Sequence, residues 1–278
     1  ALLAAAALLA GVALPWLVLA ALWAAFPFAA PLLDRPMYQE TSLSEEEKGR
    51  LTEMARATWR YFEKVVTSSD HFLPPDNLQI HPDKGIAHRT SPTNMGLYLL
   101  SCAAAQAMGF LEPDEMARRM ESSISTMERL PRWEGHFYNW YDTRTLEPLK
   151  PCYVSSVDSG NLAACLLCCA QAVRTLAPSL DASLRCLSRR MDEIALAMDL
   201  QKLYDPKAEL FYVGMDVREE EPGDSRYDLL ASESRLLSFV AVMTRQVSPR
   251  HWFRLSRTLV RTRSGATLIS WSGTMFEY

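Results

Sequence analysis

The first 33 residues of the chain carry no charged side chain and are mostly apolar, whereas every charged residue lies from Asp34 onward. A helix of about 20 apolar residues is long enough to cross a lipid bilayer. The pattern therefore predicts a transmembrane segment over residues 1–33. A secretory signal peptide is the alternative, but the run is too long for one and lacks a basic start. Because the chain begins with Ala1 rather than Met, we expect it to be a piece of a longer polypeptide.

Residues 34–48 are expected to form a polar linker and the start of the next helix. Ser44 and Glu47 have the spacing of a capping box, so the helix is expected to begin there. It should run toward Val66 with one apolar face. Residues 71–92 are rich in proline and short polar side chains, which predicts no regular structure there.

Farther along the chain, two kinds of helix alternate. Segments that are apolar on nearly every side, and are therefore expected to be buried, lie at 94–110, 161–175 and 229–244. Amphipathic segments that would cover them lie at 113–130 and 184–200, and a short helix is expected from Pro249. Such alternation is typical of two concentric helical layers. The pattern predicts an all-α fold, an α/α toroid, rather than a stacked solenoid, because no repeat of fixed period is present.

Two long connections, 131–158 and 204–228, return from an amphipathic helix to the next apolar one. Both contain short segments typical of β-hairpins. Long connections on one face of a scaffold often carry binding and catalytic residues. We therefore expect the functional site on the face that these two connections cover.

The composition excludes several classes of protein. Hydrophobic residues make up 49% of the chain and charged residues 22%, which excludes a disordered protein. The formal net charge of −4 gives no electrostatic reason to expect a nucleic-acid partner. Cys165, Cys168 and Cys169 form a cluster, but their apolar segment contains no histidine or carboxylate to complete a metal site. We interpret the cysteines as buried thiols in a reducing compartment, and we expect neither a metal nor a cofactor.

The segment 136–142, HFYNWYD, places five rings beside an amide and a carboxylate. Aromatic faces stack on the C–H groups of a sugar, and amide or carboxylate groups bind its hydroxyls. The segment therefore predicts a sugar-binding surface with the candidate residues Tyr138, Trp140, Tyr141 and Asp142. The alternative is a strand with half of its rings in the core.

Acidic residues lie at the starts of the expected inner helices. Asp158 suits a helix cap as well as a functional role. Glu233 lies inside the apolar segment 229–244, where an ionised carboxylate is unfavourable unless it is paired or functional. A buried glutamic acid with a raised pKa is typical of a glycosidase acid. The alternative is an ion pair with a distant arginine, because Arg235 would point elsewhere on a helix.

The segment 87–94 precedes the first inner helix and is expected to bring Arg89, Thr90 and Asn94 to the same rim as the two acidic residues. Arg235 and Trp271 complete the set of candidate binding residues.

The chain strongly resembles the middle region of bacterial cyclic β-1,2-glucan synthases in several blocks, among them HRTSPTNMGLYLL, GHFYNWYDTRTLEPLKPCYVSSVDSGNLA, YDLLASESRL and SWSGTMFEY. The resemblance covers about 51–278 and implies a glycoamylase-like domain related to endo-β-1,2-glucanases, with an (α/α)6 toroid. It implies a retaining transglycosylation that cuts a linear β-1,2-glucan and joins its ends. The partners that it implies are the β-1,2-glucan chain and the other domains of the same synthase polypeptide.

The same resemblance implies residue roles. Glu233, in ASESR, would be one catalytic carboxylate, and Asp158, in SVDSGN, would be a sugar-binding or supporting carboxylate of the same cleft. Trp140, Tyr141 and Glu277 would line the subsites.

A reaction that retains the configuration at the anomeric carbon requires two carboxyl groups about 5 to 5.5 Å apart. The second catalytic glutamate is expected beyond Tyr278, because the chain stops before such a toroid is complete. The fragment alone is therefore expected to be inactive or incomplete, with apolar faces of its inner helices exposed.

The expected organisation is a transmembrane segment at 1–33, a linker and helix start at 34–48, and a C-terminally truncated toroid domain at 49–278. The protein would sit in the bacterial plasma membrane. Basic residues that follow the membrane segment favour the cytoplasmic side for the soluble domain: Arg35, Lys48 and Arg50. Two alternatives remain, an endo-β-1,2-glucanase and a glucan-binding module without catalysis.

Overall fold

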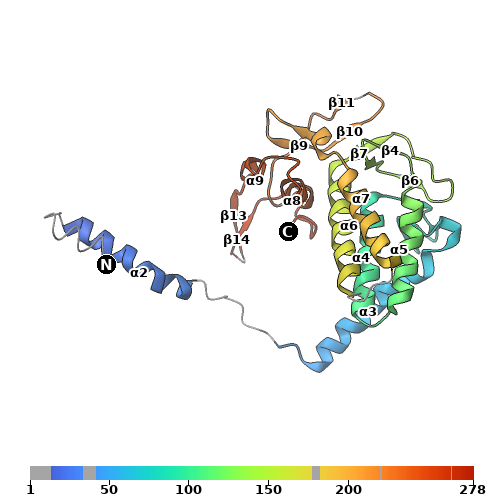
Figure 1. Ribbon diagram of the computed structural model, residues 1–278, viewed down its shortest axis with the longest axis horizontal. Coiled ribbons are helices and arrows are strands. Elements are labelled where there is room, and N and C mark those ends of the chain that lie inside the picture. The colour runs from blue at the N-terminus through green and yellow to red at the C-terminus, as the bar shows by residue number, and fades with distance from the viewer. Residues whose placement is uncertain (1–13, 34–41, 177–181, 220, 264) are drawn as a thin grey trace. The chain divides into compact units, whose positions relative to one another are not determined.

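The computed structural model describes residues 14–33, 42–176, 182–219, 221–263 and 265–278. The chain divides into two compact units, Ala1–Leu51 and Thr52–Tyr278. Helices and short strands alternate along the second unit (Figure 1).

The first unit contains helix α2 (Leu14–Leu33), whose large side chains, including Trp23 and Phe26, are exposed. The residues of this helix whose side chains the structure describes, Trp16–Ala30, form one continuous apolar stretch. Residues 1–13 of the expected transmembrane segment, and most of the expected linker, lie outside the described residues. Among the described helices, α6 (Ser156–Leu176) is long and apolar enough to cross a membrane, but most of it is buried in the protein.

Helix α3 (Glu45–Val65) begins at the predicted capping box. The Ser44 hydroxyl accepts a hydrogen bond from the Glu47 N–H at 3.3 Å, and Glu47 Oε2 accepts one from the Ser44 N–H at 2.8 Å. The pair satisfies two backbone donors at the helix start. The prediction for this helix start is confirmed.

Four helices form most of the core of the second unit: α4 (Pro92–Ala107), α5 (Pro113–Met127), α6 and α7 (Ala182–Ala197). The apolar helix α6 packs against both α4 and α7, and α5 contacts α4 and α7. The amphipathic helices α5 and α7 turn rows such as Met116, Met120 and Ile124 inward. These helices have the character and nearly the bounds that the sequence predicts.

The expected helix at 229–244 is partly wrong. Helix α8 covers only Arg235–Met243 and is followed by α9 (Arg250–Arg254). Leu229 and Ala231 instead form parallel bridges with Ser256 and Ser270. The backbone N–H and C=O groups of 228–231 pair with these other segments of the chain, so they do not form the hydrogen bonds of a helical turn.

Helix α8 is also not buried on every side. It turns Leu237, Val240 and Ala241 into the core but leaves Leu236 and Phe239 exposed by 46% and 54%. The apolar exposure that the sequence predicts for inner helices is therefore present on α8.

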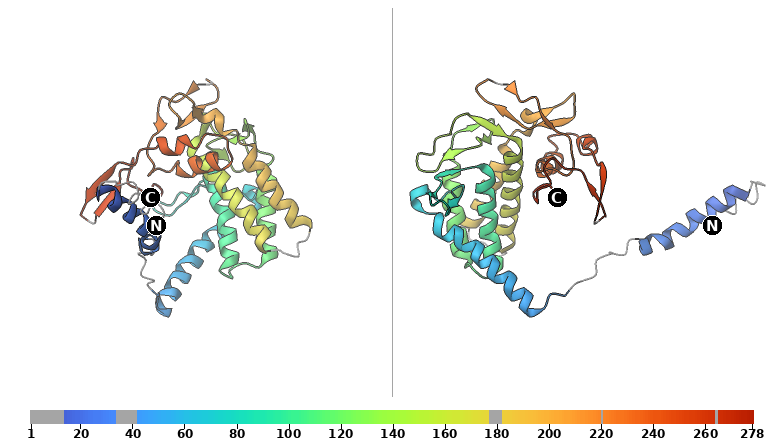
Figure 2. Two further views of the ribbon diagram at one scale, coloured as in Figure 1. Left: turned by 60° about the vertical axis from the view of Figure 1, so that its left-hand side comes forward. Right: turned by 180° about the vertical axis from the view of Figure 1, so that it is seen from behind.

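Strands of two to four residues form small antiparallel ladders in the connections. The three-stranded ladders are β7 (Tyr153–Ser155) with β10 (Gly214–Asp216) and β11 (Glu221–Pro222), and β9 (Leu210–Tyr212) with β8 (Tyr204–Asp205) and β12 (Arg226–Tyr227). The two-stranded ladders are β1 (Leu78–Gln79) with β2 (Gly85–Ile86), β3 (Arg89–Thr90) with β6 (Tyr141–Asp142), β4 (Arg132–Trp133) with β5 (His136–Phe137), and β13 (Leu259–Thr262) with β14 (Gly265–Leu268). Strands of both long connections lie at one end of the bundle α4–α7 (Figures 1 and 2).

The prediction of no regular structure at 71–92 is wrong, because β1, β2 and β3 lie there and a 3-10 turn, Ser68–Asp70, precedes them. Buried Asp70 holds this region in place. Its carboxylate accepts hydrogen bonds from the Thr143 hydroxyl at 2.5 Å and from His88 Nδ1 at 2.7 Å. Burial alone would raise the pKa of Asp70, but these two hydrogen bonds lower it below the ordinary value.

Glycine allows the closest approach between helices. A Cβ atom at Gly160 of α6 would lie 2.5 Å from the Cα atom of Leu237 in α8. The backbone of α8 therefore contacts α6 at this point, two residues after the start of α8. This contact positions the residues that precede α8 beside the first turn of α6.

Two buried histidines join helices to the connections. Nε2 of His136 donates to the Asp199 carbonyl and Nδ1 accepts from the Ser159 hydroxyl, both at 2.9 Å. Nδ1 of His251 donates to the Glu209 carbonyl, and Nε2 faces the Ser238 hydroxyl, both at 2.8 Å. Burial lowers the pKa of both rings below 6.5, so they are neutral at pH 7.

Gly160→Ala is expected to lower the free energy of unfolding by about 1–3 kcal/mol, because the added methyl group overlaps the backbone of α8. The measurement is urea unfolding of the variant beside Gly223→Ala. An added Cβ at Gly223 meets only the Gly214 carbonyl, at an ordinary 3.7 Å, so this control should keep its stability. Equal stability of Gly160→Ala and the parent would contradict the close helix contact.

Stability is expected to fall as the pH drops below about 6.5, the ordinary histidine pKa. The pKa values of His136 and His251 are lower in the folded state, so the unfolded chain binds more protons in this window. Each histidine contributes at most about 1.4 kcal/mol per pH unit. Denaturant unfolding between pH 8 and pH 5 measures the slope. His136→Gln should reduce the slope of stability against pH, whereas His81→Gln, at an exposed position, should not. The same slope in the parent and in both variants would exclude the buried histidines as its cause.

Candidate functional site

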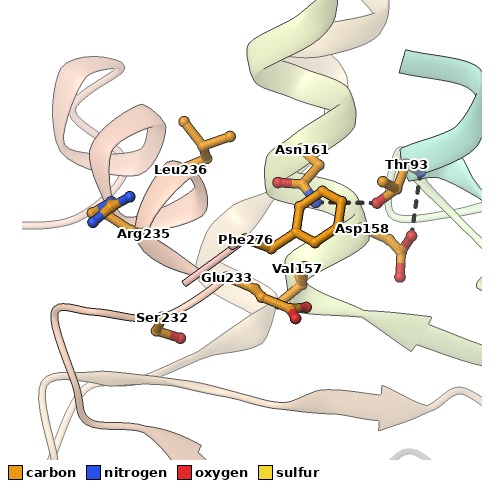
Figure 3. Close-up of a pocket in the computed structure, with 9 residues that line it drawn as sticks. All are labelled: Thr93, Val157, Asp158, Asn161, Ser232, Glu233, Arg235, Leu236 and Phe276. Carbon is orange, nitrogen blue, oxygen red and sulfur yellow. Dashed lines mark hydrogen bonds between the residues drawn. The ribbon is translucent and has the colours of Figure 1, made fainter. Parts of the chain in front are cut away.

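A pocket of about 440 Å³ lies where α4, α6 and α8 begin (Figure 3). The residues that line it come from four segments: Thr93, Val157, Asp158, Asn161, Ser232, Glu233, Arg235, Leu236 and Phe276. Glu233, Asp158 and Arg235 were candidates from the sequence, and the fold brings these three together.

Asp158 lies in the first turn of α6 and is half-buried. Its Oδ1 atom accepts a hydrogen bond from the Thr93 N–H at 3.2 Å, in the first turn of α4. The Ser155 hydroxyl accepts from the Asp158 N–H at 3.2 Å and therefore caps α6. The alternative that Asp158 caps its own helix is wrong: it satisfies a donor of the neighbouring helix. Two helix N-termini favour its negative charge.

The other oxygen of Asp158 is held by the segment 136–142. With its amide nitrogen toward Asp158, Asn139 donates to Oδ2 at 2.8 Å and accepts from Trp140 Nε1 at 3.2 Å. On the other side, the Asn161 amide donates to the Thr93 hydroxyl at 3.2 Å. Both carboxylate oxygens of Asp158 thus have a fixed donor.

Glu233 is not inside a helix, contrary to the sequence prediction. It lies in an exposed turn immediately before α8, and its carboxylate extends toward Val157 and the first turn of α6 (Figure 3). Within the described part of the chain, no arginine or lysine forms a salt bridge with it, so the ion-pair alternative finds no support there. The neighbouring Ser232 and Ser234 are buried, with their hydroxyl oxygens 3.1 Å apart. These two buried serines fix the turn on either side of Glu233, whose own side chain is exposed at the pocket wall.

Arg235 begins α8 and donates to the Tyr278 carbonyl at 2.7 Å. Its guanidinium points away from Asp158 (Figure 3), and its bond to Tyr278 joins the end of the segment 271–278 to α8. Phe276 of this segment is 70% exposed, and its ring lies in the pocket. Phe276 is not among the candidates from the sequence, because nothing in the sequence separates a ring in a pocket wall from a ring in the core.

Glu277 does not line the pocket, so the expected subsite role is wrong. Its buried carboxylate accepts hydrogen bonds from the N–H groups of Trp271, Ser272 and Thr274, at 3.0–3.1 Å, and from the Ser272 hydroxyl at 2.9 Å. Burial alone would raise the pKa of Glu277, but the bonds from Thr274 and Ser272 hold it at about 2. Glu277 is the residue that organises this loop.

Trp271 is 55% exposed and packs edge-on against Tyr227, with ring centroids 6.3 Å apart. It lies outside the set of lining residues. Burial, and then the charge of Glu233, raise the pKa of Tyr227 to about 12. Tyr227 is therefore a neutral hydrogen-bond donor close to Glu233. Sequence reasoning did not single it out.

The aromatic segment divides between core and surface. Tyr141 is fully buried and donates to the Pro131 carbonyl at 2.6 Å, so its expected subsite role is wrong. Its hydroxyl oxygen also accepts from the Tyr138 N–H at 2.9 Å, and Tyr138 is half-buried. Oδ1 of Asp142 accepts from the N–H groups of Arg144 and Thr145 at 2.8 and 2.9 Å, as in a turn, and its role as a sugar ligand stays a prediction.

Trp140 is half-buried, and its ring lies under the Arg89 guanidinium, 4.5 Å from it. Arg89 donates to Asp76 Oδ2 at 2.9 and 3.1 Å, and the Asn94 amide lies 3.5 Å from Asp76 Oδ1. Arg89 and Asn94 therefore lie beside the pocket and not in its wall. Thr90 is fully buried, so its expected place on the rim is wrong.

Within the described ranges, no group of three or more histidine, cysteine or acidic side chains is placed to hold a metal ion. The six cysteines are free thiols, and Cys168 is exposed rather than buried as expected. The pocket offers an accessible carboxylate, Glu233, opposite a carboxylate with fixed donors, Asp158. A ring at Phe276 and an amide at Asn161 complete a surface suited to a polyhydroxylated substrate.

Residues 53–178 match a family model described as a protein of unknown function, DUF3131. The chain is 31% identical to the cyclic β-(1,2)-glucan synthase NdvB of Rhizobium meliloti (strain 1021) over 382 aligned positions, which cover 93% of this chain. It spans 14% of the length of that relative.

Solved structures with a similar fold share little sequence with the chain. A putative glucoamylase from Bacteroides fragilis matches with a TM-score of 0.65 at 16% identity, over 85% of this chain and 58% of that one. The endo-β-1,2-glucanase from Chitinophaga pinensis matches with a TM-score of 0.65 at 13% identity, over 84% and 57%. The endo-β-1,2-glucanase from Talaromyces funiculosus matches with a TM-score of 0.62 at 13% identity, over 80% and 54%.

These matches show that the second unit shares its helical fold with glucoamylase-like and β-1,2-glucanase structures, although the chain spans little more than half of each. Together with the sequence match, they confirm the resemblance seen in the motifs: the chain is homologous to a segment of a cyclic β-1,2-glucan synthase.

Proposed function

We propose that this chain is the part of a cyclic β-1,2-glucan synthase that closes linear β-1,2-glucan into a ring by retaining transglycosylation. The observation that carries the proposal is the meeting of Glu233 and Asp158 in one accessible pocket. They come from the blocks ASESR and SVDSGN, which lie far apart in the sequence. The glucan-active relatives support a role in glucan processing.

In the proposed reaction, Glu233 donates its proton to the glycosidic oxygen of the bond that breaks. A second carboxylate, other than Glu233 and Asp158, attacks the anomeric carbon and forms a glycosyl ester, while the glucan fragment beyond the cleaved bond leaves with the donated proton on its new hydroxyl. A hydroxyl at the other end of the same chain then attacks that carbon, loses its proton to Glu233 and releases the carboxylate. The ring closes without net consumption of water.

Asp158 fits a supporting role better than that of the nucleophile. Both of its oxygens already accept hydrogen bonds, from Thr93 and Asn139. A carboxylate held in this way is fixed in orientation and accepts a further hydrogen bond from a sugar hydroxyl. We assign to Asp158 the positioning of a glucose unit beside Glu233.

Hydrolysis is the second candidate function. The structural likeness to endo-β-1,2-glucanases favours it, because the same glycosyl ester attacked by water gives linear products. The two reactions differ only in the acceptor. A binding module without catalysis is the third candidate, and it predicts binding of the glucan without turnover.

The membrane anchor and the cellular side of the domain are also proposals. We propose that residues 1–33 anchor the protein in the bacterial plasma membrane and that residues 49–278 are an incomplete (α/α)6 toroid on the cytoplasmic side. The uncharged start of the chain and the exposed apolar side chains of α2 support the anchor. The basic residues that follow support the orientation.

Glu233→Gln, introduced in the intact polypeptide that carries this chain, is expected to lower ring closure by about 10²–10⁴-fold. Glutamine keeps the size of the side chain but has no proton to give. Polymerisation of glucose by the rest of the synthase should continue, so linear glucan should accumulate. Mass spectrometry of the products measures both effects.

The matched control is Glu63→Gln, an exposed glutamate on α3 outside the pocket, which should leave the products unchanged. Unchanged cyclic product from Glu233→Gln would remove Glu233 from the mechanism. Loss of polymer in both variants would indicate a folding defect instead.

A further inference from the structure

A second hollow, of about 330 Å³, lies beside the candidate site. Rings and aliphatic groups form one part of its wall and polar side chains the other: Tyr61, Phe62, Pro74, Pro75, Asp76, Asn77, Leu78, Asn94 and Leu97. Tyr61 and Phe62 are half-buried, and Leu97 is 37% exposed. The hollow is therefore open to solvent and has both an apolar and a hydrogen-bonding wall.

Asp76 is the polar centre of this second hollow. Its carboxylate accepts hydrogen bonds from Arg89 at 2.9 and 3.1 Å, from the Asn77 amide at 3.0 Å and from the Asn94 amide at 3.5 Å. These contacts fix three side chains around one wall. Burial, and then the charge of Asp76, raise the pKa of the nearby Tyr61, which keeps its hydroxyl protonated.

Both hollows are lined by residues of the first turn of α4. Thr93 lines the candidate site, and the next residue, Asn94, lines the second hollow. A continuous series of contacts also connects them: Asp76 binds Arg89, Arg89 covers Trp140, and Trp140 reaches Asp158 through Asn139. The polar groups of both hollows are thus held in one network.

We propose that the second hollow binds a glucose unit of the same glucan chain that is cut at Glu233, so that one chain crosses the first turn of α4 and occupies both hollows. The proposal rests on the proposed function. A pyranose ring has apolar faces and a rim of hydroxyls, and the hollow offers a Tyr61 ring opposite carboxylate and amide groups. No charged ligand is required, because the Asp76 charge is already compensated by Arg89.

The test is the binding of linear β-1,2-glucans of increasing length to the intact polypeptide that carries this chain. Leu97→Trp places a large ring in the second hollow, at a position that does not line the candidate site. Leu100→Trp is the matched control, on the same helix, 38% exposed and outside the lining of both hollows. Tyr61→Leu removes the ring and hydroxyl but keeps an apolar side chain at that position.

Leu97→Trp and Tyr61→Leu are each expected to weaken the binding of long chains by about tenfold, while the affinity for a disaccharide stays within about twofold. Leu100→Trp should change neither. A loss of the same size at every chain length, or no loss at all, would overturn the proposal that one chain occupies both hollows. Absence of β-1,2-glucan binding by the parent protein would instead overturn the proposed function, and the inference with it.

Discussion

The contact between α6 and α8 at Gly160 is the constraint on which the candidate site depends. Only a residue without a side chain allows the backbone of α8 at Leu237 to approach so closely. Asp158 lies two residues before this contact on α6, and Glu233 lies four residues before it on the other segment. The contact therefore sets the separation of the two carboxylates. Catalytic geometry of this kind tolerates little displacement.

The N-terminal ends of the apolar helices α4, α6 and α8 supply the rest of the site. Free N–H groups and the helix dipoles at these ends favour negative charge. Asp158 uses this property, because it joins α6 to the first turn of α4 through Thr93. The connections then add aromatic and polar groups around these carboxylates, from the segment around Trp140 and from the loop that Glu277 organises. Helices thus fix the carboxylates, and the connections shape the surface around them.

Much of the fold was predictable from the sequence because it depends on local patterns. The Ser44 capping box, the amphipathic helices α5 and α7 and the apolar helices α4 and α6 follow from spacing alone. The turn that carries Glu233 was not predictable, because the segment before it pairs through Leu229 with Ser256 and through Ala231 with Ser270, partners more than twenty residues away. For the same reason, the sequence did not separate the buried ring of Tyr141 from the accessible ring of Trp140. The expected burial of Glu233 was wrong, although its place in the pocket was anticipated.

The central claim is that this site joins the two ends of one glucan chain. The most direct measurement is to incubate linear β-1,2-glucan with the intact polypeptide and to follow the products by mass spectrometry. The account predicts cyclic products that are lighter by one water molecule than linear chains with the same number of glucose units. Each ring is accompanied by the linear end that the cut releases. Linear fragments alone would contradict ring closure and establish a hydrolase.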